Sequence, residues 1–315
     1  MSLPVTIESL REAAAGLAGV AERTPLIPLP FDLPFPVRLK AEYLQPIGAF
    51  KIRGAWTALR RLDAGARRRG VVTSSSGNHG MGVAWAANRL GVRAVVVMPE
   101  SAAAIKVQGV RDLGAVVVLA GRTRGPEQTA EAERLRDAEG LTMIPPFDHP
   151  DVIAGQGTVG LEILEQWPEV GTIMAPIGGG GLLAGICTAV SAMAPAVRVV
   201  AVEPAGIPKL SGAFANRAPT SVAGVSLADG LLTPSVGELT WPLIRDVVRD
   251  VVAVTDDELR AAMRWLARAG IRVEPSGAAT TGAILAGHFR PDGPTVVVST
   301  GRNVDPDRYR ELTAA

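Results

Sequence analysis

Cysteine is almost absent from this sequence: Cys187 is the single one among 315 residues. One cysteine excludes an internal disulfide framework and is typical of proteins of the reducing cytosol, so we expect a cytoplasmic protein. Cys187 ends the apolar run 182–187, which is typical of a buried helix face. We therefore interpret its thiol as part of the core rather than as a nucleophile.

Aromatic residues and net charge are also scarce. Phe, Trp and Tyr make up 4% of the chain, and the formal net charge is +1. The basic stripe and stacking rings of a nucleic-acid-binding protein are therefore missing. The three histidines, His79, His149 and His288, lack zinc-ligand spacing, and the Gly-x-Ser-x-Gly elbow of serine hydrolases does not occur.

We expect neither a signal peptide nor a continuous membrane span. Glu8, Arg11 and Glu12 give the N-terminus a helical pattern instead of a basic start followed by an apolar stretch. Residues 170–197 carry no charge and are long enough to span a bilayer. Pro176 and four consecutive glycines interrupt them, so we predict a buried strand, a glycine loop and a helix in a soluble protein.

Short apolar runs rich in β-branched residues alternate with helical patterns along the chain. Strands are expected at residues 70–73, 93–98, 115–119, 172–177, 197–202 and 295–298, and a helix at 81–90. Continuous apolar strands separated by helices are typical of parallel sheets that are covered on both faces. The sequence therefore predicts an α/β fold.

One lysine, Lys51, stands in an unusual setting within residues 45–55, QPIGAFKIRGA. Burial of an ammonium among apolar residues lowers its pKa toward that of a usable amine. A neutral lysine amine forms a Schiff base with an aldehyde and moves protons. Taken alone, a lysine is usually a surface residue whose stem lies along an apolar patch, so the surrounding residues decide its interpretation.

Residues 45–55 resemble the Schiff-base lysine motif of the pyridoxal-phosphate (PLP) enzymes of fold type II, the threonine/serine dehydratase and serine racemase family. That motif is usually GSFKxRGA, and Ala49 departs from it at the serine. The resemblance runs from about residue 20 to residue 305. It implies PLP as the cofactor, Lys51 as its attachment point and catalytic base, and Phe50 as a residue that packs near the ring.

The resemblance also implies the arrangement of the chain in space. It suggests a tryptophan synthase β-like fold of two lobes, with parallel sheets covered by helices in both. The large PLP-binding domain would comprise residues 1–69 and 149–315, and residues 70–148 would form a small inserted domain.

A second segment, residues 73–80 (TSSSGNHG), follows an expected strand and precedes the helix at 81–90. Hydroxyls and N–H groups at a helix N-terminus form an anion site, although Ser and Asn are also ordinary N-caps. The segment resembles the family's Ser-Ser-Gly-Asn-His loop, which implies that Asn78 bonds to the ring hydroxyl of the cofactor. By the same resemblance, Ser76 faces the substrate on the side opposite the lysine. The residues implied to bind the substrate are Ser75, Gly77 and His79.

A third segment consists of four consecutive glycines at residues 178–181, after an expected strand and before an expected helix. Such a loop lets the backbone approach a phosphate at a helix N-terminus. Gly179-x-Gly181-x-x-Ala184, with Glu203 about 20 residues on, also fits the fingerprint of an NAD-binding dehydrogenase. The lysine motif and the asparagine loop favour PLP, because NAD binding requires neither. The resemblance assigns Gly178, Gly179, Gly180 and Gly181 to the PLP phosphate.

A fourth segment, residues 296–305 (VVVSTGRNVD), is a strand end followed by hydroxyl residues. In the family this segment is usually Ser-Gly-Gly-Asn, and its hydroxyl meets the pyridine nitrogen. The resemblance gives this role to Thr300, with Ser299 as the second choice. Arg302 replaces a glycine and faces either the ring, where it would disfavour a protonated pyridine, or the solvent.

Some relatives bind a divalent cation through a Glu after a strand and an acid six residues on. Here Glu203 is present and Lys209 occupies the second position. We therefore predict no metal there, with the lysine ammonium in place of the ion. Glu274, in another family-like segment, is either a residue near the cofactor or a structural acid.

These residues together imply a dehydratase that acts on L-threonine, L-serine or a related 3-hydroxy amino acid and gives a 2-keto acid and ammonia. Lys51 would remove the Cα proton, and the hydroxyl of Thr300 would leave the ring a weak electron sink, which favours prompt loss of a β-substituent. A racemase remains the second interpretation, with Ser76 returning the proton from the opposite face. The expected partner is a small amino acid, with no nucleic acid or membrane, and relatives are commonly homodimers or larger homo-oligomers.

Overall fold

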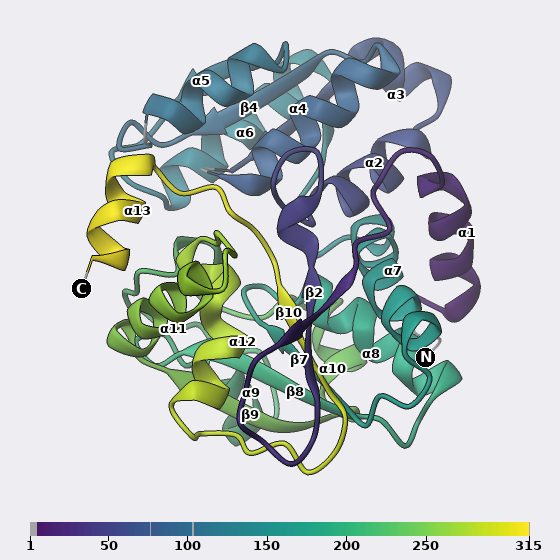
Figure 1. The fold of residues 1–315 in the computed structure, drawn as a ribbon. Helices are drawn as coiled ribbons and strands as arrows, with labels where there is room; N and C mark the ends of the chain where they lie inside the picture. The colour runs from purple at the N-terminus through teal and green to yellow at the C-terminus, as the bar shows by residue number, and fades with distance from the viewer. Residues whose placement is uncertain (1–4, 76, 103, 315) are drawn as a thin grey trace.

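The computed structural model describes residues 5–75, 77–102 and 104–314, which fold into two β-sheets flanked by helices. The smaller sheet and its helices lie above the larger sheet in Figure 1. The predicted α/β class is confirmed, because helices cover both faces of each sheet. The division into domains at residues 69/70 and 148/149 stays a prediction.

The larger sheet has the strand order β1-β2-β10-β7-β8-β9 in the described part of the chain. Its strands are β1 Leu26–Leu29, β2 Val37–Ala41, β7 Thr172–Pro176, β8 Arg198–Pro204, β9 Val248–Val254 and β10 Thr295–Ser299. Each neighbouring pair is parallel except β1 and β2, which are antiparallel. The sequence predicted the parallel strands β7, β8 and β10 but not β1, β2 or β9.

The smaller sheet has the order β5-β4-β3-β6 and is parallel throughout its described strands. These strands are β3 Val71–Ser74, β4 Ala94–Met98, β5 Val116–Leu119 and β6 Thr142–Met143. Three of them lie within a residue of their expected positions. The two-residue strand β6 is too short to leave a pattern in the sequence.

Helices bury both faces of the larger sheet. Val296 and Val298 of β10 pack on one side, in the same core cluster as residues of α1, α7, α8, α9 and α10, whereas Val297 packs on the other side with α11, α12 and α13. Successive strand residues point to opposite faces, so a strand covered on both sides is apolar at every position. The helices are α1 Ile7–Leu17, α7 Pro150–Gln166, α8 Gly181–Met193, α9 Lys209–Asn216, α10 Trp241–Ile244, α11 Asp256–Arg268, α12 Pro275–Leu285 and α13 Pro306–Thr313.

The smaller sheet is covered in the same way, with α2, α4 and α5 on one face and α6 on the other. The helices of this part are α2 Ile52–Arg60, α3 Ala64–Arg69, α4 Asn78–Leu90, α5 Ala104–Asp112 and α6 Pro126–Glu139. Two short 3₁₀ turns, η1 Glu42–Leu44 and η2 Asp229–Leu231, belong to the connections. The helix expected at 81–90 therefore begins one turn earlier, at Asn78, after the N-cap Gly77.

Two helices of the larger part, α7 and α8, approach each other closely because glycines face each other across their contact. A Cβ added to Gly185 would lie only 2.5 Å from the Cα of Gly157. This contact fixes α8, whose N-terminus faces the pocket described below.

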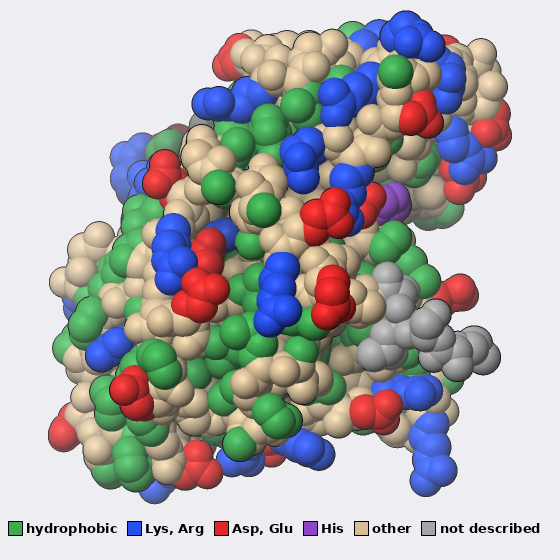
Figure 2. Space-filling model, turned by 90° about the vertical axis from the view of Figure 1, so that its right-hand side faces the viewer, with side chains coloured by type: hydrophobic (Ala, Val, Ile, Leu, Met, Phe, Trp, Pro, Cys, Tyr) green, Lys and Arg blue, Asp and Glu red, His purple; other side chains and the backbone are tan. Residues whose placement is uncertain are grey.

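The surface carries charges of both signs. Figure 2 shows Lys, Arg, Asp and Glu side chains interspersed on the face turned to the viewer. Among the described residues, no helix is both long and apolar enough to cross a membrane.

Candidate active site

A pocket of about 470 Å³ lies at the carboxyl ends of strands from both sheets. Ser74 ends β3, Pro176 ends β7 and Thr300 directly follows β10, and all three line the pocket. In α/β proteins, ligands bind at this edge of parallel sheets. The predicted site residues that line it are Phe50, Lys51, Ser75, Gly77, Asn78, His79, Gly178, Gly179, Gly180, Gly181 and Thr300. Ser76 lies outside the described residues.

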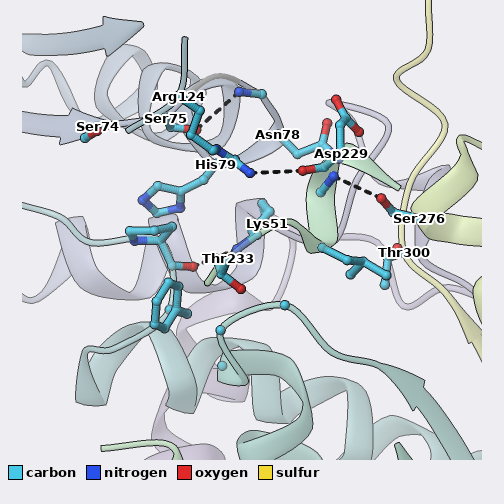
Figure 3. Close-up of a pocket in the computed structure, with 18 of the residues that line it drawn as sticks. Lys51, Ser74, Ser75, Asn78, His79, Arg124, Asp229, Thr233, Ser276 and Thr300 are labelled. Atoms are coloured by element: carbon cyan, nitrogen blue, oxygen red, sulfur yellow. Dashed lines mark hydrogen bonds between the residues drawn. The ribbon is translucent and has the colours of Figure 1, made fainter. Parts of the chain in front are cut away.

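Lys51 occupies the N-cap position of α2, and its side chain extends into the pocket (Figure 3). Its Nζ donates a hydrogen bond to the Pro146 carbonyl at 2.6 Å and lies 5.2 Å from the centre of the Phe50 ring. Burial, and secondly the nearby Arg124 guanidinium, lower the pKa of Lys51 to about 7. A large fraction of the amine is therefore neutral at neutral pH.

The segment that carries Lys51 is tied to the end of β10. The Phe50 N–H donates to the Thr300 carbonyl at 3.1 Å, and Ala49 forms a β-bridge with Gly301. This pairing brings Lys51 and Thr300 to the same pocket although about 250 residues separate them in the chain.

A buried network of ion pairs holds the start of α2. Arg53 donates from Nε and Nη2 to the two carboxylate oxygens of Glu42, each at 2.8 Å, and from Nη1 to Glu162 at 2.6 Å. Lys40 of β2 also binds Glu162 at 2.6 Å. Burial by itself would lower the pKa of Arg53, but the Glu42 carboxylate raises it above the ordinary value, so the guanidinium stays charged. The network holds Arg53, two residues after Lys51, and so fixes the start of α2.

The asparagine loop is held by side-chain hydrogen bonds. Ser75 Oγ accepts from the N–H of Gly77 at 3.3 Å and of Gly80 at 2.9 Å. Asn78 donates to Glu274 at 2.7 Å and accepts from Asn303 at 2.8 Å, so its amide has a fixed orientation. Glu274 is buried, and burial, together with Asp229, raises the pKa of its carboxyl.

His79 lies deeper than the sequence predicts for a substrate-binding residue. It is buried, and its Nε2 donates to the Ile144 carbonyl at 3.0 Å. Burial, followed by the Lys51 charge, lowers the pKa of His79 to about 3, so the imidazole is neutral. Its Nδ1 has no partner among the described residues.

The four glycines form a turn from β7 into α8. Gly180 has φ +99°, a left-handed conformation that glycine adopts without a steric cost. A Cβ on Gly179 would lie 2.3 Å from the Phe147 ring, so the loop has no space for side chains. The first N–H groups of a helix have no partner inside it, and here they belong to residues that line the pocket.

The two hydroxyl residues at the end of β10 lie in different places. Thr300 lines the pocket, whereas Ser299 faces α12, where its Oγ would be 3.3 Å from a Cβ on Gly277. Arg302 is exposed and does not line the pocket, so of the two predicted orientations its side chain has the one toward solvent.

Glu203 is engaged away from the pocket. Its carboxylate accepts from the Leu210 N–H at 2.7 Å and the Ser211 hydroxyl at 2.6 Å, at the start of α9. Lys209 is buried and donates to the carbonyls of Ile177 and Ile207 at 3.3 Å each. The described residues contain no cluster of three or more His, Cys, Asp or Glu side chains placed to hold a metal ion.

The sequence analysis did not identify three charged residues that line the pocket, Lys106, Arg124 and Asp229. Lys106 lies in the first turn of α5, and Arg124 lies in the loop before α6. Lys106 forms an ion pair with Asp229 of η2, and Arg124 donates to the Asp229 carbonyl. Each lies in a stretch typical of an ordinary polar loop or helix surface. Only the packing of the two sheets brings them together, so no local pattern could have identified them.

The chain is similar to known proteins over nearly all of its length. The family described as "Pyridoxal-phosphate dependent enzyme" matches residues 17–301. An L-threonine ammonia-lyase of Geobacter sulfurreducens is 41% identical over 96% of this chain and 76% of its own length. An L-threo-3-hydroxyaspartate ammonia-lyase of Pseudomonas sp. is 39% identical over 96% of both chains. The structure of maize serine racemase superposes with a TM-score of 0.94 and 35% identity, covering 98% of this chain and 96% of that one.

Fold and site together define a PLP-dependent enzyme. The chain belongs to the pyridoxal-phosphate dependent enzyme family and, within fold type II, to its threonine/serine dehydratase and serine racemase group. The predicted family and cofactor are thereby confirmed, and the NAD-binding alternative is wrong, since the acid that it needs caps α9.

The residues of the pocket fit PLP. The Lys51 amine, whose pKa is about 7, can react with the aldehyde of PLP. The glycine turn at the N-terminus of α8 can bind its phosphate. Thr233 lines the pocket and has a buried Oγ1 that is unpaired among the described residues, so it offers a further hydrogen bond to a ligand.

Proposed function

We propose that this protein is a PLP-dependent ammonia-lyase that converts a 3-hydroxy amino acid, such as L-threonine or L-serine, into a 2-keto acid and ammonia. The observation that carries the proposal is the Lys51 amine, with a pKa of about 7, in one pocket with the uncharged hydroxyl of Thr300. Two of the relatives described above are ammonia-lyases, which supports this class.

In this proposal the chain holds PLP at three points. Residues 178–181 bind the phosphate through main-chain N–H groups, Asn78 bonds to the ring hydroxyl and Thr300 lies at the ring nitrogen. Glu274 and Asn303 keep the Asn78 amide in place. When bound, PLP supplies an electron sink for the Cα of the substrate.

Lys51 is proposed to remove the Cα proton. An amine with a pKa of about 7 accepts a proton efficiently at neutral pH, because the best catalytic bases have pKa values near the working pH. His79, with a pKa of about 3, does not compete for that proton. Thr300 carries no charge to stabilise a protonated ring, and a weak electron sink favours prompt loss of the β-hydroxyl.

The α-carboxylate of the substrate is proposed to bind at the N-terminus of α4. Ser75 and Gly77 lie at this end of the helix and line the pocket. The positive end of a helix dipole and its free N–H groups suit an anion.

A racemase is the second candidate, favoured by the likeness to maize serine racemase over 98% of this chain. Lys51 would remove the same proton, and a group on the opposite face would return it. Ser76 is the proposed group.

A proton NMR time course of L-serine and L-threonine in D₂O with the holoenzyme tests both candidates. The lyase predicts pyruvate or 2-oxobutyrate, and the racemase predicts loss of the α-proton signal while the amino acid persists. Lys51→Ala should abolish either change. An amino acid that keeps its α-proton with every substrate tried would contradict the proposal.

We further propose a cytoplasmic homo-oligomer. Cys187 is the single cysteine of the sequence and is buried, and a chain without an internal disulfide is typical of a reducing compartment. Val225, which is 81% exposed, and Phe35 are among the large apolar side chains that an interface could cover. Light scattering after gel filtration tests the oligomer, which a monomeric mass would contradict.

A further inference from the structure

Two cationic side chains, Lys106 and Arg124, line the pocket close to one acidic residue, Asp229. Lys106 forms an ion pair with the Asp229 carboxylate. Arg124 instead donates from Nη1 to the main-chain carbonyl of Asp229, at 3.0 Å. Within the described chain, no ion pair joins Arg124 to a carboxylate, so its charge is not neutralised by a direct partner.

Arg124 lies close to the reacting lysine. It lines the pocket, and its charge is the second cause of the lowered pKa of Lys51. Figure 3 shows its side chain between Ser75 and Asp229, on the side of Lys51 where Asn78 also lies. The residue is exposed, so its guanidinium is open to a ligand in the pocket.

Two anions expected in the pocket already have other sites. The glycine turn proposed for the phosphate packs against Gly230 and Thr233, since a Cβ on Gly178 would lie 3.2 and 3.4 Å from their oxygens. The N-terminus of α4 proposed for the α-carboxylate has Lys106 beside it, with Nζ 3.8 Å from a Cβ placed on Gly77. Neither site needs Arg124, which leaves a guanidinium for a third anionic group.

We propose that Arg124 binds a carboxylate on the β-carbon of the substrate, so that the substrate class is a 3-hydroxy amino acid with two carboxylates. This inference rests on the proposed ammonia-lyase function. A guanidinium binds a carboxylate through two parallel hydrogen bonds, which a methyl group or a hydrogen at the same place could not form.

The reaction is redox neutral. The Cα–H bond breaks with its proton passing to Lys51, the Cβ–O bond breaks with hydroxide leaving as water, and a Cα=Cβ bond forms. The released enamine takes its proton at Cβ, and a water molecule then replaces nitrogen at Cα. One water leaves and one enters, so 3-hydroxyaspartate, the simplest such substrate, gives oxaloacetate and ammonia.

The first test compares kcat/KM of the holoenzyme for 3-hydroxyaspartate and for L-threonine. Arg124→Gln should lower the ratio of kcat/KM for 3-hydroxyaspartate to kcat/KM for L-threonine by about 10- to 100-fold, the value of a lost charge-assisted hydrogen bond. The effect of the lost charge on the pKa of Lys51 acts on both substrates and cancels in this ratio. Arg124→Lys should recover part of the lost activity toward 3-hydroxyaspartate, because a lysine keeps the positive charge but cannot form the two parallel hydrogen bonds of a guanidinium. Arg122→Gln, on the same loop but outside the pocket, is the matched control.

Binding of succinate, measured by calorimetry on the holoenzyme, is the second readout. Succinate should bind more tightly than butyrate, which has the same chain length and one carboxylate, and Arg124→Gln should remove the difference. Equal binding of the two acids, or an equal loss of both amino-acid activities in Arg124→Gln, would overturn the inference. If the wild type consumed neither amino acid, the proposed function would fail, while succinate binding would still decide the role of Arg124.

Discussion

The Lys51 amine is reactive because its place in the pocket lowers its pKa. A lysine in water has a pKa of about 10.4 and is almost fully charged at neutral pH. In this pocket burial and the Arg124 guanidinium both disfavour the ammonium, and only the Pro146 carbonyl accepts a hydrogen bond from it in the described chain. The fold therefore holds a nucleophile ready before any ligand arrives.

The first prediction concerns the pH at which the apoprotein takes up PLP. Only the neutral amine attacks an aldehyde, so the uptake rate should rise with pH and become constant above about 7, the folded pKa of Lys51. An ordinary lysine would give a rate that rises until about pH 10. The visible absorbance of the bound cofactor reports the rate.

Lys51→Ala is the control for this measurement, because it should show no such band at any pH. A wild-type rate that still increased in proportion to hydroxide between about pH 8 and 9 would mean that the Lys51 pKa is not lowered.

At the scale of elements, the site depends on two helix N-termini. α4 follows β3 and α8 follows β7, and both helices begin at the pocket after a glycine N-cap. Parallel strands direct their following helices away from the same edge, so the N-terminal ends of the helices gather there. The two ends suit the two anions, phosphate and carboxylate, that PLP and an amino acid bring.

The second prediction compares two glycine substitutions. Gly180 and Gly287 both have positive φ, so either change to alanine should destabilise the fold by about 1 kcal/mol. A Cβ on Gly180 would also lie 2.8 Å from Thr240 Oγ1, whereas nothing lies within 4 Å of a Cβ on Gly287. Gly180→Ala should therefore also weaken PLP binding about tenfold, equivalent to about 1.4 kcal/mol.

Urea unfolding measures the first effect and a PLP titration the second. Equal PLP affinities of the two variants would contradict a role of the Gly180 conformation in holding the phosphate.

Two of the strands that sequence analysis missed, β2 and β9, carry charges whose partners are distant in the chain. β2 contains Lys40, which interrupts its apolar pattern, and the buried ammonium donates to Glu162, Gln166 and the Thr24 carbonyl. β9 contains Asp250, which pairs with Arg198 of β8. Strands such as β7 and β10, in contrast, are apolar at nearly every position and could be predicted from composition alone.

At the scale of the whole molecule, the pocket joins the two sheets. Its residues range from Phe50 to Thr300 and come from both parts of the fold. The motifs around Lys51, Asn78 and the glycine turn could be predicted because each is a run of consecutive residues. Arg124 could not, since its place in the pocket depends on how the sheets pack.

The third prediction concerns removal of the cofactor. In the proposed placement, PLP contacts residues of both parts of the folded chain, so it should stabilise the fold by mass action, by about 2.7 kcal/mol at a hundred times its Kd. The apoprotein should therefore melt at a lower temperature than the holoenzyme by calorimetry. Pyridoxal without the phosphate should restore less of the difference, and an unchanged melting temperature would contradict the placement of PLP in this pocket.

The position of β10 in the larger sheet has a consequence for synthesis on the ribosome. β10 lies between β2 and β7, but it follows every other described strand in the chain, since it begins at Thr295. Until it emerges, the nascent chain has two unjoined groups of strands with open edges, and Thr300 is absent from the pocket. The complete set of residues that line the pocket therefore assembles only after β10 has been made and has inserted between β2 and β7.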